Sequence, residues 1–569
     1  MLFTKENNKS LPLLQLVTTL FIMLAPFILG NADNAIYAYM LMACTGAIFV
    51  FRVYEAGRYY VSIYHFFLTV LLGYSALSLT WITNRSTHFV YMAVISSAML
   101  ILSLMIDYFS ESSEEKAHRR IMYMLSVGSI LCALQNCIYW LTDIVPFGTK
   151  ESFSQGMGSN HFLAVFTLTG IVVTSLLIKG NSRLRKVIFA FGIALMLFVF
   201  IMCKSVFAWI LLISFAVIFL SSRKSDKLFF TVSAAAIIIF TALTLLIFFS
   251  TEISSVFKGV FSYGSLFGRG GGFLSAGELY LDKLYSHTDM PGLLAVLYAS
   301  SGIIGLLCAA LFIAKPVVHF IKLKTWASVL NVFLTVMIMF LPFARSLTVL
   351  VLWMGIIAYN EKTGDYAAKR IFSQKADVRK KAGYIAGIIG LITVMFICQR
   401  FLVLGADFEY EKKDYMASYS LYNSASFINP FDSESAFMAA QSLYKSGSVE
   451  KFYNEAIVLV DKAHERDRDN LLCNKLKAQI HHACGRYDMA VQEYTYISSR
   501  AKVNDEYNLM LVESLYEIIQ ANPEGSAETV EVYDKIVEIA KNTENPDYRE
   551  KINNIADKAL VYTRRRTEY

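Results

Sequence analysis

The chain has 569 residues, of which 56% are hydrophobic and only 17% are charged, and its mean hydropathy is +0.47. That length exceeds one ordinary globular domain and the apolar share is far above a soluble average, which excludes a purely soluble enzyme or binding module. The net charge of +7 does not indicate a nucleic-acid partner, because most of the excess lies in short loops between apolar blocks.

The apolar residues are gathered in blocks about as long as the roughly 20 residues that a helix needs to cross a bilayer. We expect spans at approximately 13–30, 36–52, 61–82, 88–106, 121–142, 160–179, 187–203, 205–221, 228–249, 291–313, 326–342, 346–359 and 383–404. The pattern predicts an all-α, polytopic transmembrane helical bundle. About twelve core spans lie in residues 1–360, a basic linker occupies 361–382, and one further span occupies 383–404.

Lysine and arginine alternate between successive loops in a way that predicts orientation. Alternate loops hold 24 of these residues on one side and 7 on the other. Because the more basic loops of a membrane protein stay in the cytoplasm, we expect a cytoplasmic amino terminus and a cytoplasmic 361–382 linker. The long loop at 250–290 and residues 405–569 are then predicted to be extracytoplasmic.

Several cations and one imidazole fall on the predicted outer side. Arg269 is followed by three glycines, and His287 precedes the apolar span that contains Gly302-Ile303-Ile304-Gly305. Lys204 separates two apolar runs, and Arg345 lies at another tight outer turn. Cations near hydrocarbon are costly and usually face a polar cavity. For each cation taken alone, a side chain that reaches the interface from an apolar stretch is the alternative interpretation.

The last 165 or so residues have the composition of a soluble helical domain. Tyr453 and Tyr487 lie 34 residues apart, as do Ala456 and Ala490, and glycines at 447 and 485 fall between predicted helices. A helical pair repeated at this period is the tetratricopeptide signature, and such stacks form concave binding surfaces. We therefore predict an extracytoplasmic tetratricopeptide-like domain at 405–569.

The eight cysteines predict neither a metal site nor a disulfide framework. They contain no Cys-x-x-Cys pair, which is the usual spacing of metal ligands. Cys473 and Cys484 lie eleven residues apart on one predicted helix, about 16 Å along its axis, which is too far for a disulfide. Free thiols are expected.

Three short motifs in this topology resemble the O-antigen ligase and O-antigen polymerase family of bacterial membrane enzymes. Gly158-Ser159-Asn160-His161-Phe162-Leu163-Ala164 is similar to that family's Asn-His-x-Ala segment, and Cys203-Lys204-Ser205-Val206-Phe207-Ala208 to its Thr-x-Ser-Arg-Gly-Ala segment. Gly268-Arg269, His287 and Gly302–Gly305 resemble its Gly-Arg, His-Asn and Gly-Ile-Ile-Gly series. The resemblance covers residues 1–360. Lys204 stands where an arginine is usual, and Thr288 follows the histidine in place of asparagine.

The resemblance implies a metal-independent glycosyltransferase without a cofactor, located in the bacterial cytoplasmic membrane. Its donor would be an oligosaccharide linked to undecaprenyl diphosphate, and its acceptor a hydroxyl of a glycan, lipid, wall polymer or protein. His287 would be the catalytic base, and Arg269, Lys204 and Arg345 would bind the diphosphate. Asn160 and His161 would line the route by which the donor arrives. Ligase and polymerase activities use the same donor, so both stay open, and the tail is expected to bind a protein or the acceptor.

Two other classes of function compete with this interpretation. A transporter or flippase for an anionic lipid-linked glycan would also need a basic outer cavity, and it should contain internal repeats and broken helices. A non-enzymatic membrane scaffold that recruits partners through its tail would leave the outer cations without a role.

Overall fold

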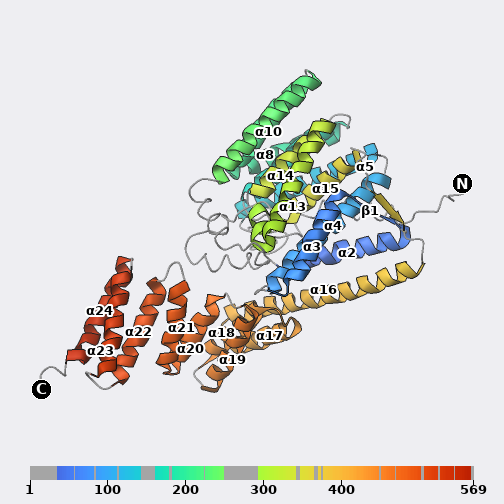
Figure 1. The fold of residues 1–569 in the computed structure, drawn as a ribbon. Coiled ribbons are helices and arrows are strands. Elements are labelled where there is room, and N and C mark those ends of the chain that lie inside the picture. The colour runs from blue at the N-terminus through green and yellow to red at the C-terminus, as the bar shows by residue number, and fades with distance from the viewer. Residues whose placement is uncertain are drawn as a thin grey trace. The chain divides into compact units, whose positions relative to one another are not determined.

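A computed structural model describes residues 35–56, 58–81, 85–111, 114–142, 160–178, 182–222, 225–248, 293–340, 347–363, 369–372, 376–447, 450–467, 470–500, 505–522, 526–543 and 545–564. These residues are helical apart from one two-stranded sheet (Figure 1), which confirms the predicted all-α class. The chain divides into two compact units, of which the first ends at Ile397 and the second includes Cys398–Tyr569.

The predicted spans that fall on described residues are all helices, whereas the span at 13–30 lies outside those residues. The helices are α2 (Ala35–Ala56), α3 (Ile63–Ser78), α4 (Arg85–Glu111), α5 (Glu114–Thr142), α7 (Asn160–Ile178), α8 (Arg183–Met202), α9 (Val206–Ser222), α10 (Asp226–Phe248), α13 (Leu293–Leu323), α14 (Trp326–Phe340), α15 (Leu347–Thr363) and α16 (Ala376–Glu411).

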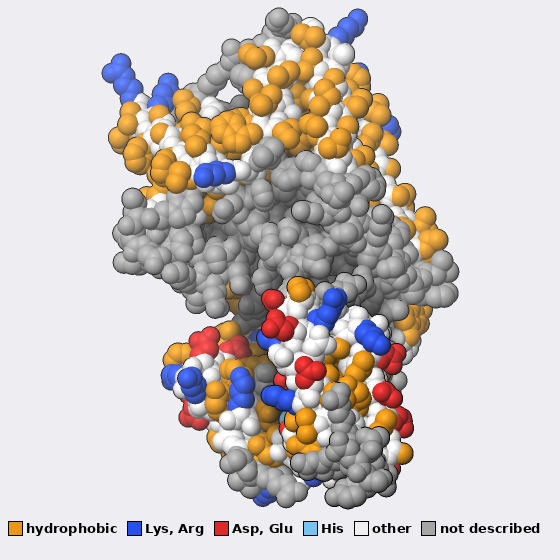
Figure 2. All heavy atoms as spheres, turned by 90° about the vertical axis from the view of Figure 1, so that its left-hand side faces the viewer, with side chains coloured by type: hydrophobic (Ala, Val, Ile, Leu, Met, Phe, Trp, Pro, Cys, Tyr) orange, Lys and Arg blue, Asp and Glu red, His pale blue; other side chains and the backbone are white. Residues whose placement is uncertain are grey.

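Several of these helices are suited to a membrane. Five stretches among the described residues are long and apolar enough to cross one: His88–Ser110, Arg119–Ile138, Arg183–Met202, Asp226–Leu246 and Ser301–Leu323. Five shorter apolar helices accompany them. Apolar side chains cover much of the exposed surface of this unit in Figure 2, which a surface facing water would not normally allow. The predicted number of spans and their orientation remain predictions.

Close helix approach in the first unit depends on small residues. A Cβ on Gly170 of α7 would lie 2.3 Å from the Ser129 Cβ of α5 and 2.7 Å from the Met196 Sδ of α8. Between α5 and α7 the hydroxyls of Ser126 and Thr174 lie 2.7 Å apart and form a hydrogen bond. Glycine and interhelical hydroxyl pairs are the usual means of association where the hydrophobic effect is absent.

The predicted end of one span differs from the structure. We expected a break after residue 313, but α13 continues through Lys315, Pro316 and Lys322 to Leu323. Two lysines do not stop a helix, because their aliphatic stems can cover apolar surface while the amines reach water. The turn comes at Lys324, which has a φ of 52°. Thr325 then caps α14, since its Oγ1 accepts a hydrogen bond from the Ser328 amide at 3.3 Å.

Two strands join segments that are far apart in the sequence. Strand β1 (Arg58–Val61) pairs antiparallel with β2 (Lys369–Phe372), and Arg58 lies opposite Phe372. β1 precedes α3, and β2 lies within the predicted basic linker at 361–382. The two segments therefore belong to the same end of this unit, as the charge pattern predicts.

The second unit is a row of antiparallel helices that pack mainly on their neighbours in sequence. After the end of α16 they are α17 (Tyr415–Ile428), α18 (Ser433–Ser446), α19 (Glu450–Arg466), α20 (Leu471–Ala483), α21 (Tyr487–Arg500), α22 (Asp505–Ala521), α23 (Ala527–Asn542) and α24 (Pro546–Arg564). Ala456 and Ala490 are fully buried. Gly485 has a φ of 70° in the turn before α21, a conformation that favours glycine. The tetratricopeptide class of this unit stays a prediction.

All eight cysteines are free, and two of them in the second unit permit a reactivity test. Cys473 is 1% exposed, and burial raises the pKa of its thiol to about 12, whereas Cys484 is partly exposed. Because the thiolate is the reactive form, iodoacetamide at pH 8 should alkylate Cys473 at least about 100-fold more slowly than Cys484. Mass-spectrometric mapping of the native chain measures both rates. Equal rates before unfolding would contradict the packing of α20.

Candidate functional site

Most of the predicted site residues lie outside the part of the chain that the structure describes. Arg269, His287 and Arg345 lie outside the described residues. Asn160 and His161 form the first turn of α7, but their side chains are also outside the description. The convergence of these groups on one cleft therefore remains a prediction, and the described geometry concerns Lys204 and the glycine motif.

Lys204 occupies the turn between α8 and α9. Its φ of 50° ends α8, and its amide donates to the Ile201 carbonyl at 3.2 Å. Ser205 then begins α9, since its Oγ accepts from the Ala208 amide at 3.3 Å. The lysine side chain is exposed, and no described carboxylate lies within 4.0 Å of its amine. A cation held this way can meet an anion, but it equally suits an interface residue, so both interpretations stay open.

The glycine motif breaks α13. Gly302 has φ 57° and ψ −138°, values that are not helical, so α13 consists of two helical parts that meet at this residue. Only glycine adopts such a conformation without steric cost. Broken helices at membrane depth are tolerated where the freed backbone groups are buried in protein or line a polar cavity.

Gly305 is required by the same break. Because the first part of α13 folds toward the second, the Leu297 carbonyl oxygen lies 2.0 Å from the place where a Gly305 Cβ would stand. The Ser301 Cβ is 3.2 Å from the same point. The spacing of the two glycines thus has a local physical cause: one permits the turn and the other leaves room for the carbonyl.

A buried polar cluster adjoins this break. Tyr91 of α4 places its hydroxyl 3.4 Å from the Ser301 Oγ of α13. His88, one turn earlier on α4, has its Nε2 2.8 Å from the Ser75 carbonyl oxygen and 3.2 Å from the Ser78 Oγ, both of α3. The histidine and both serines of α3 are fully buried. Three helices therefore bring an imidazole and several hydroxyls to the broken part of α13.

Sequence reasoning missed this cluster, although a signal was present. His88 begins a predicted span and His161 is the second residue of another, and an ionisable side chain within an apolar helix is by default a candidate for function. Tyr91 and Ser301 carry no comparable signal, because hydroxyl residues are common in membrane helices. Their proximity follows only from the packing of α4 on α13.

Two further groups of buried charged side chains lie in the first unit, and the sequence analysis used only their lysine and arginine, as orientation markers. The Arg52 Nε of α2 lies 2.5 Å from the Asp107 Oδ2 of α4, and both side chains are nearly fully buried. Glu361 of α15 is 2% exposed, with its Oε1 3.1 Å from the His319 Nε2 and 3.7 Å from the Lys315 Nζ of α13. Buried charges of this kind persist when they are paired.

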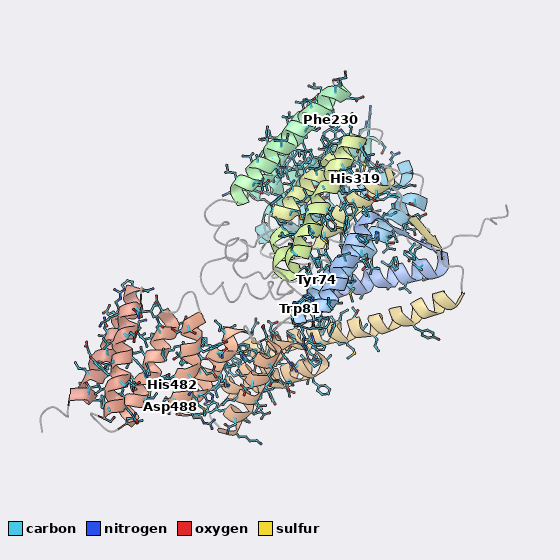
Figure 3. All side chains as sticks on the ribbon, viewed as in Figure 1. Tyr74, Trp81, Phe230, His319, His482 and Asp488 are labelled. Atoms are coloured by element: carbon cyan, nitrogen blue, oxygen red, sulfur yellow. The ribbon has the colours of Figure 1, made fainter. Side chains whose placement is uncertain are left out.

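The His88 cluster and the Glu361 group lie toward different ends of the first unit. Tyr74 and Trp81, whose ring centroids are 5.9 Å apart, mark the end of α3 near which His88 is anchored. Figure 3 shows these two aromatic residues at one end of the bundle and His319 nearer the other end. Aromatic residues are enriched where a membrane helix meets water, so this pair suits an interface position.

The described residues contain no group of three or more histidine, cysteine, aspartate or glutamate side chains that could hold a metal ion. Comparison of the sequence with protein-family models and with curated proteins yields no match.

Proposed function

We propose that the chain is a membrane glycosyltransferase of the O-antigen ligase and polymerase type. It transfers or polymerises an oligosaccharide from an undecaprenyl-diphosphate-linked donor onto an acceptor hydroxyl at the outer face of the membrane. The long apolar helices support the proposal that the chain is a membrane protein. The enzymatic part rests on the ordered set of Arg269, His287 and the Gly302–Gly305 motif.

One structural observation carries most weight in favour of the proposal. The Gly302–Gly305 motif is a break in α13 that adjoins buried hydroxyls and an imidazole, and it lies shortly after His287 in the sequence. Broken membrane helices of this kind form substrate sites in other proteins when their freed backbone groups line a cavity.

The proposed chemistry assigns each charge a task. The acceptor hydroxyl attacks the anomeric carbon, a new C–O bond forms, and the bond from that carbon to the donor's phosphate oxygen breaks. The electron pair of the broken bond stays on undecaprenyl diphosphate, where Arg269, Lys204 and Arg345 would stabilise it. His287 would take the hydroxyl proton, since an imidazole titrates near neutral pH.

Reconstitution with a lipid-linked oligosaccharide and a labelled acceptor tests the proposal directly. His287→Ala and Arg269→Ala should each reduce transfer at least about 100-fold, as expected for loss of a general base or of an electrostatic stabiliser. Arg185→Ala and His482→Ala are matched controls, because each removes the same type of side chain at a described position to which the proposal assigns no role, and Arg185 lies at the start of α8 on the predicted cytoplasmic side. Full transfer by both site variants would refute the assignment.

A transporter of an anionic lipid-linked glycan is the second candidate, and the break in α13 favours it too. Broken helices form the substrate sites of many transporters. The same vesicles distinguish the two functions: movement of intact lipid-linked glycan across the bilayer, with no new glycosidic bond, would favour transport. A new bond formed with wild-type protein and lost in His287→Ala would favour transfer.

A further inference from the structure

Helix α17 folds back along the end of α16. The Ser418 Oγ donates to the Ala406 carbonyl at 3.0 Å, and the Tyr422 hydroxyl donates to the Asp407 carboxylate. Further along α17, a Cβ on Gly405 would meet the Leu421 side chain at 3.7 Å. Gln399, farther back along α16, contacts Asp432 and Ser435, which follow α17 in the sequence, so the carboxyl end of α17 points back toward the apolar part of α16.

The corner between α17 and α18 therefore lies beside residues inside the predicted 383–404 span. The Gln399 Nε2 donates to the Asp432 carboxylate at 2.5 Å and to the Ser435 Oγ at 3.2 Å. Gln399 precedes Leu404 by five residues, or about 7–8 Å along a helix. The corner therefore lies alongside the last residues of the apolar run, where the predicted span ends.

The interior of this corner is polar: the Gln399 amide nitrogen makes two hydrogen bonds there, whereas its Oε1 is buried without a hydrogen-bond partner among the described residues. Gln399 and Asp432 are buried. The Arg466 Nη1 of α19 donates to the Asp432 carbonyl at 2.7 Å and to the Ser426 Oγ at 2.8 Å. Polar side chains at membrane depth are found paired within the protein, and here the tail provides the partners of Gln399.

The exterior of the corner carries exposed apolar side chains beside one carboxylate, since the Glu434 side chain is 67% exposed. Phe427 is 86% exposed at the last turn of α17, and Phe431 is 37% exposed in the turn that follows. On α16 itself, Phe401 is 59% exposed and Leu404 is 48% exposed. The exposed phenylalanines of the corner thus stand at the level of an exposed apolar face of the helix that is predicted to cross the membrane.

We propose that the α17–α18 corner, residues 425–435, is a membrane-docking surface that inserts Phe427 and Phe431 into the interface of the lipid bilayer. The occupant is lipid, because the same apolar face continues along α16, which is predicted to cross the bilayer. Insertion fixes the first helical pair of the tail against the membrane surface. The proposal rests on the 383–404 span and is independent of glycosyl transfer.

Site-directed nitroxide labelling of the full chain in phosphatidylglycerol–phosphatidylcholine nanodiscs tests this docking. Cys44 and Cys398 are exposed and Cys484 is partly exposed, so the background carries Cys44→Ser, Cys398→Ser and Cys484→Ser. Labels at Phe427→Cys and, separately, Phe431→Cys are compared with Val394→Cys on α16 and Val458→Cys on α19. The two valines are 52% and 66% exposed, and they serve as lipid-facing and water-facing references.

Power saturation with oxygen and with a nickel chelate reports whether each label lies in lipid or in water. We expect labels at 427 and 431 to collide at least threefold more with oxygen relative to the nickel chelate than the label at 458, and to approach the ratio at 394. A water-like ratio at both corner positions would overturn the proposal. Protection of both corner labels from both reagents would also overturn the proposal, because it would indicate contact with protein. A water-like ratio at 394 would show that residues 383–404 do not cross the membrane, and the proposal would fail with the span.

Discussion

Asp107→Ala is expected to destabilise the protein by about 3–5 kcal/mol, the cost of leaving one member of a buried ion pair alone. The reason is the position of its partner: the Arg52 Nε lies 2.5 Å from the Asp107 Oδ2, and the side chains are 2% and 6% exposed. Without the carboxylate, the guanidinium stays in surroundings where a lone charge is poorly solvated. Unfolding of the purified chain in mixed micelles, followed by far-UV circular dichroism, measures the change.

The double variant Arg52→Leu, Asp107→Leu separates charge from packing. It removes both charges and fills their place with apolar side chains. Its free energy of unfolding should therefore lie within about 1–2 kcal/mol of the wild type, a much smaller loss than that of Asp107→Ala. Glu409→Ala is a control on an exposed pair, since the Glu409 Oε1 lies 3.1 Å from the Lys412 Nζ at the surface, and such pairs contribute about 0–1 kcal/mol. If Asp107→Ala behaved like Glu409→Ala, the pair would not be buried.

Gly305→Ala is expected to cost about 3 kcal/mol or more, at the upper end of overpacking effects. The added Cβ would stand 2.0 Å from the Leu297 carbonyl oxygen, and backbone cannot move aside as a side-chain tip can. Either the two parts of α13 separate or the break at Gly302 changes shape. Thermal unfolding in micelles measures the stability, and the transfer assay measures whether the altered break also reduces activity.

Gly73→Ala is the matched control for this substitution. Gly73 lies in α3, and a Cβ there would meet nothing within 4 Å. Because alanine has the higher helix propensity, this change should be neutral or stabilising by up to about 1 kcal/mol. Equal losses from both substitutions would show that the carbonyl of Leu297 does not approach Gly305.

The helical bundle was predictable because its signal is local. A block of apolar residues about 20 long forms a helix wherever it lies, and α8 and α9 meet at Lys204 as the sequence predicted. The end of α13 was not predictable from the same signal. Lys315 looked like the start of a loop, yet its amine lies 3.7 Å from Glu361 of another helix, a contact that depends on tertiary packing.

The candidate site was predictable only in its glycines. Gly302 and Gly305 stand out in an apolar run, and the structure gives both a steric reason. His88 and Asp107 each meet partners from other helices, and no spacing rule links residues so far apart. The proposed roles of Arg269, His287 and Arg345 stay predictions, because these residues lie outside the described parts of the chain.

The β1–β2 ladder has a consequence for biosynthesis. Its first strand emerges from the ribosome roughly 300 residues before its second, which at about 5–20 residues per second is a delay of about 15–60 s. Throughout that interval the edge of β1 lacks its native mate while most of the hydrophobic helices are being inserted. The β1–β2 pairing therefore forms late in synthesis. A nascent chain truncated before Lys369 would leave the edge of β1 available to chaperones or to a neighbouring chain.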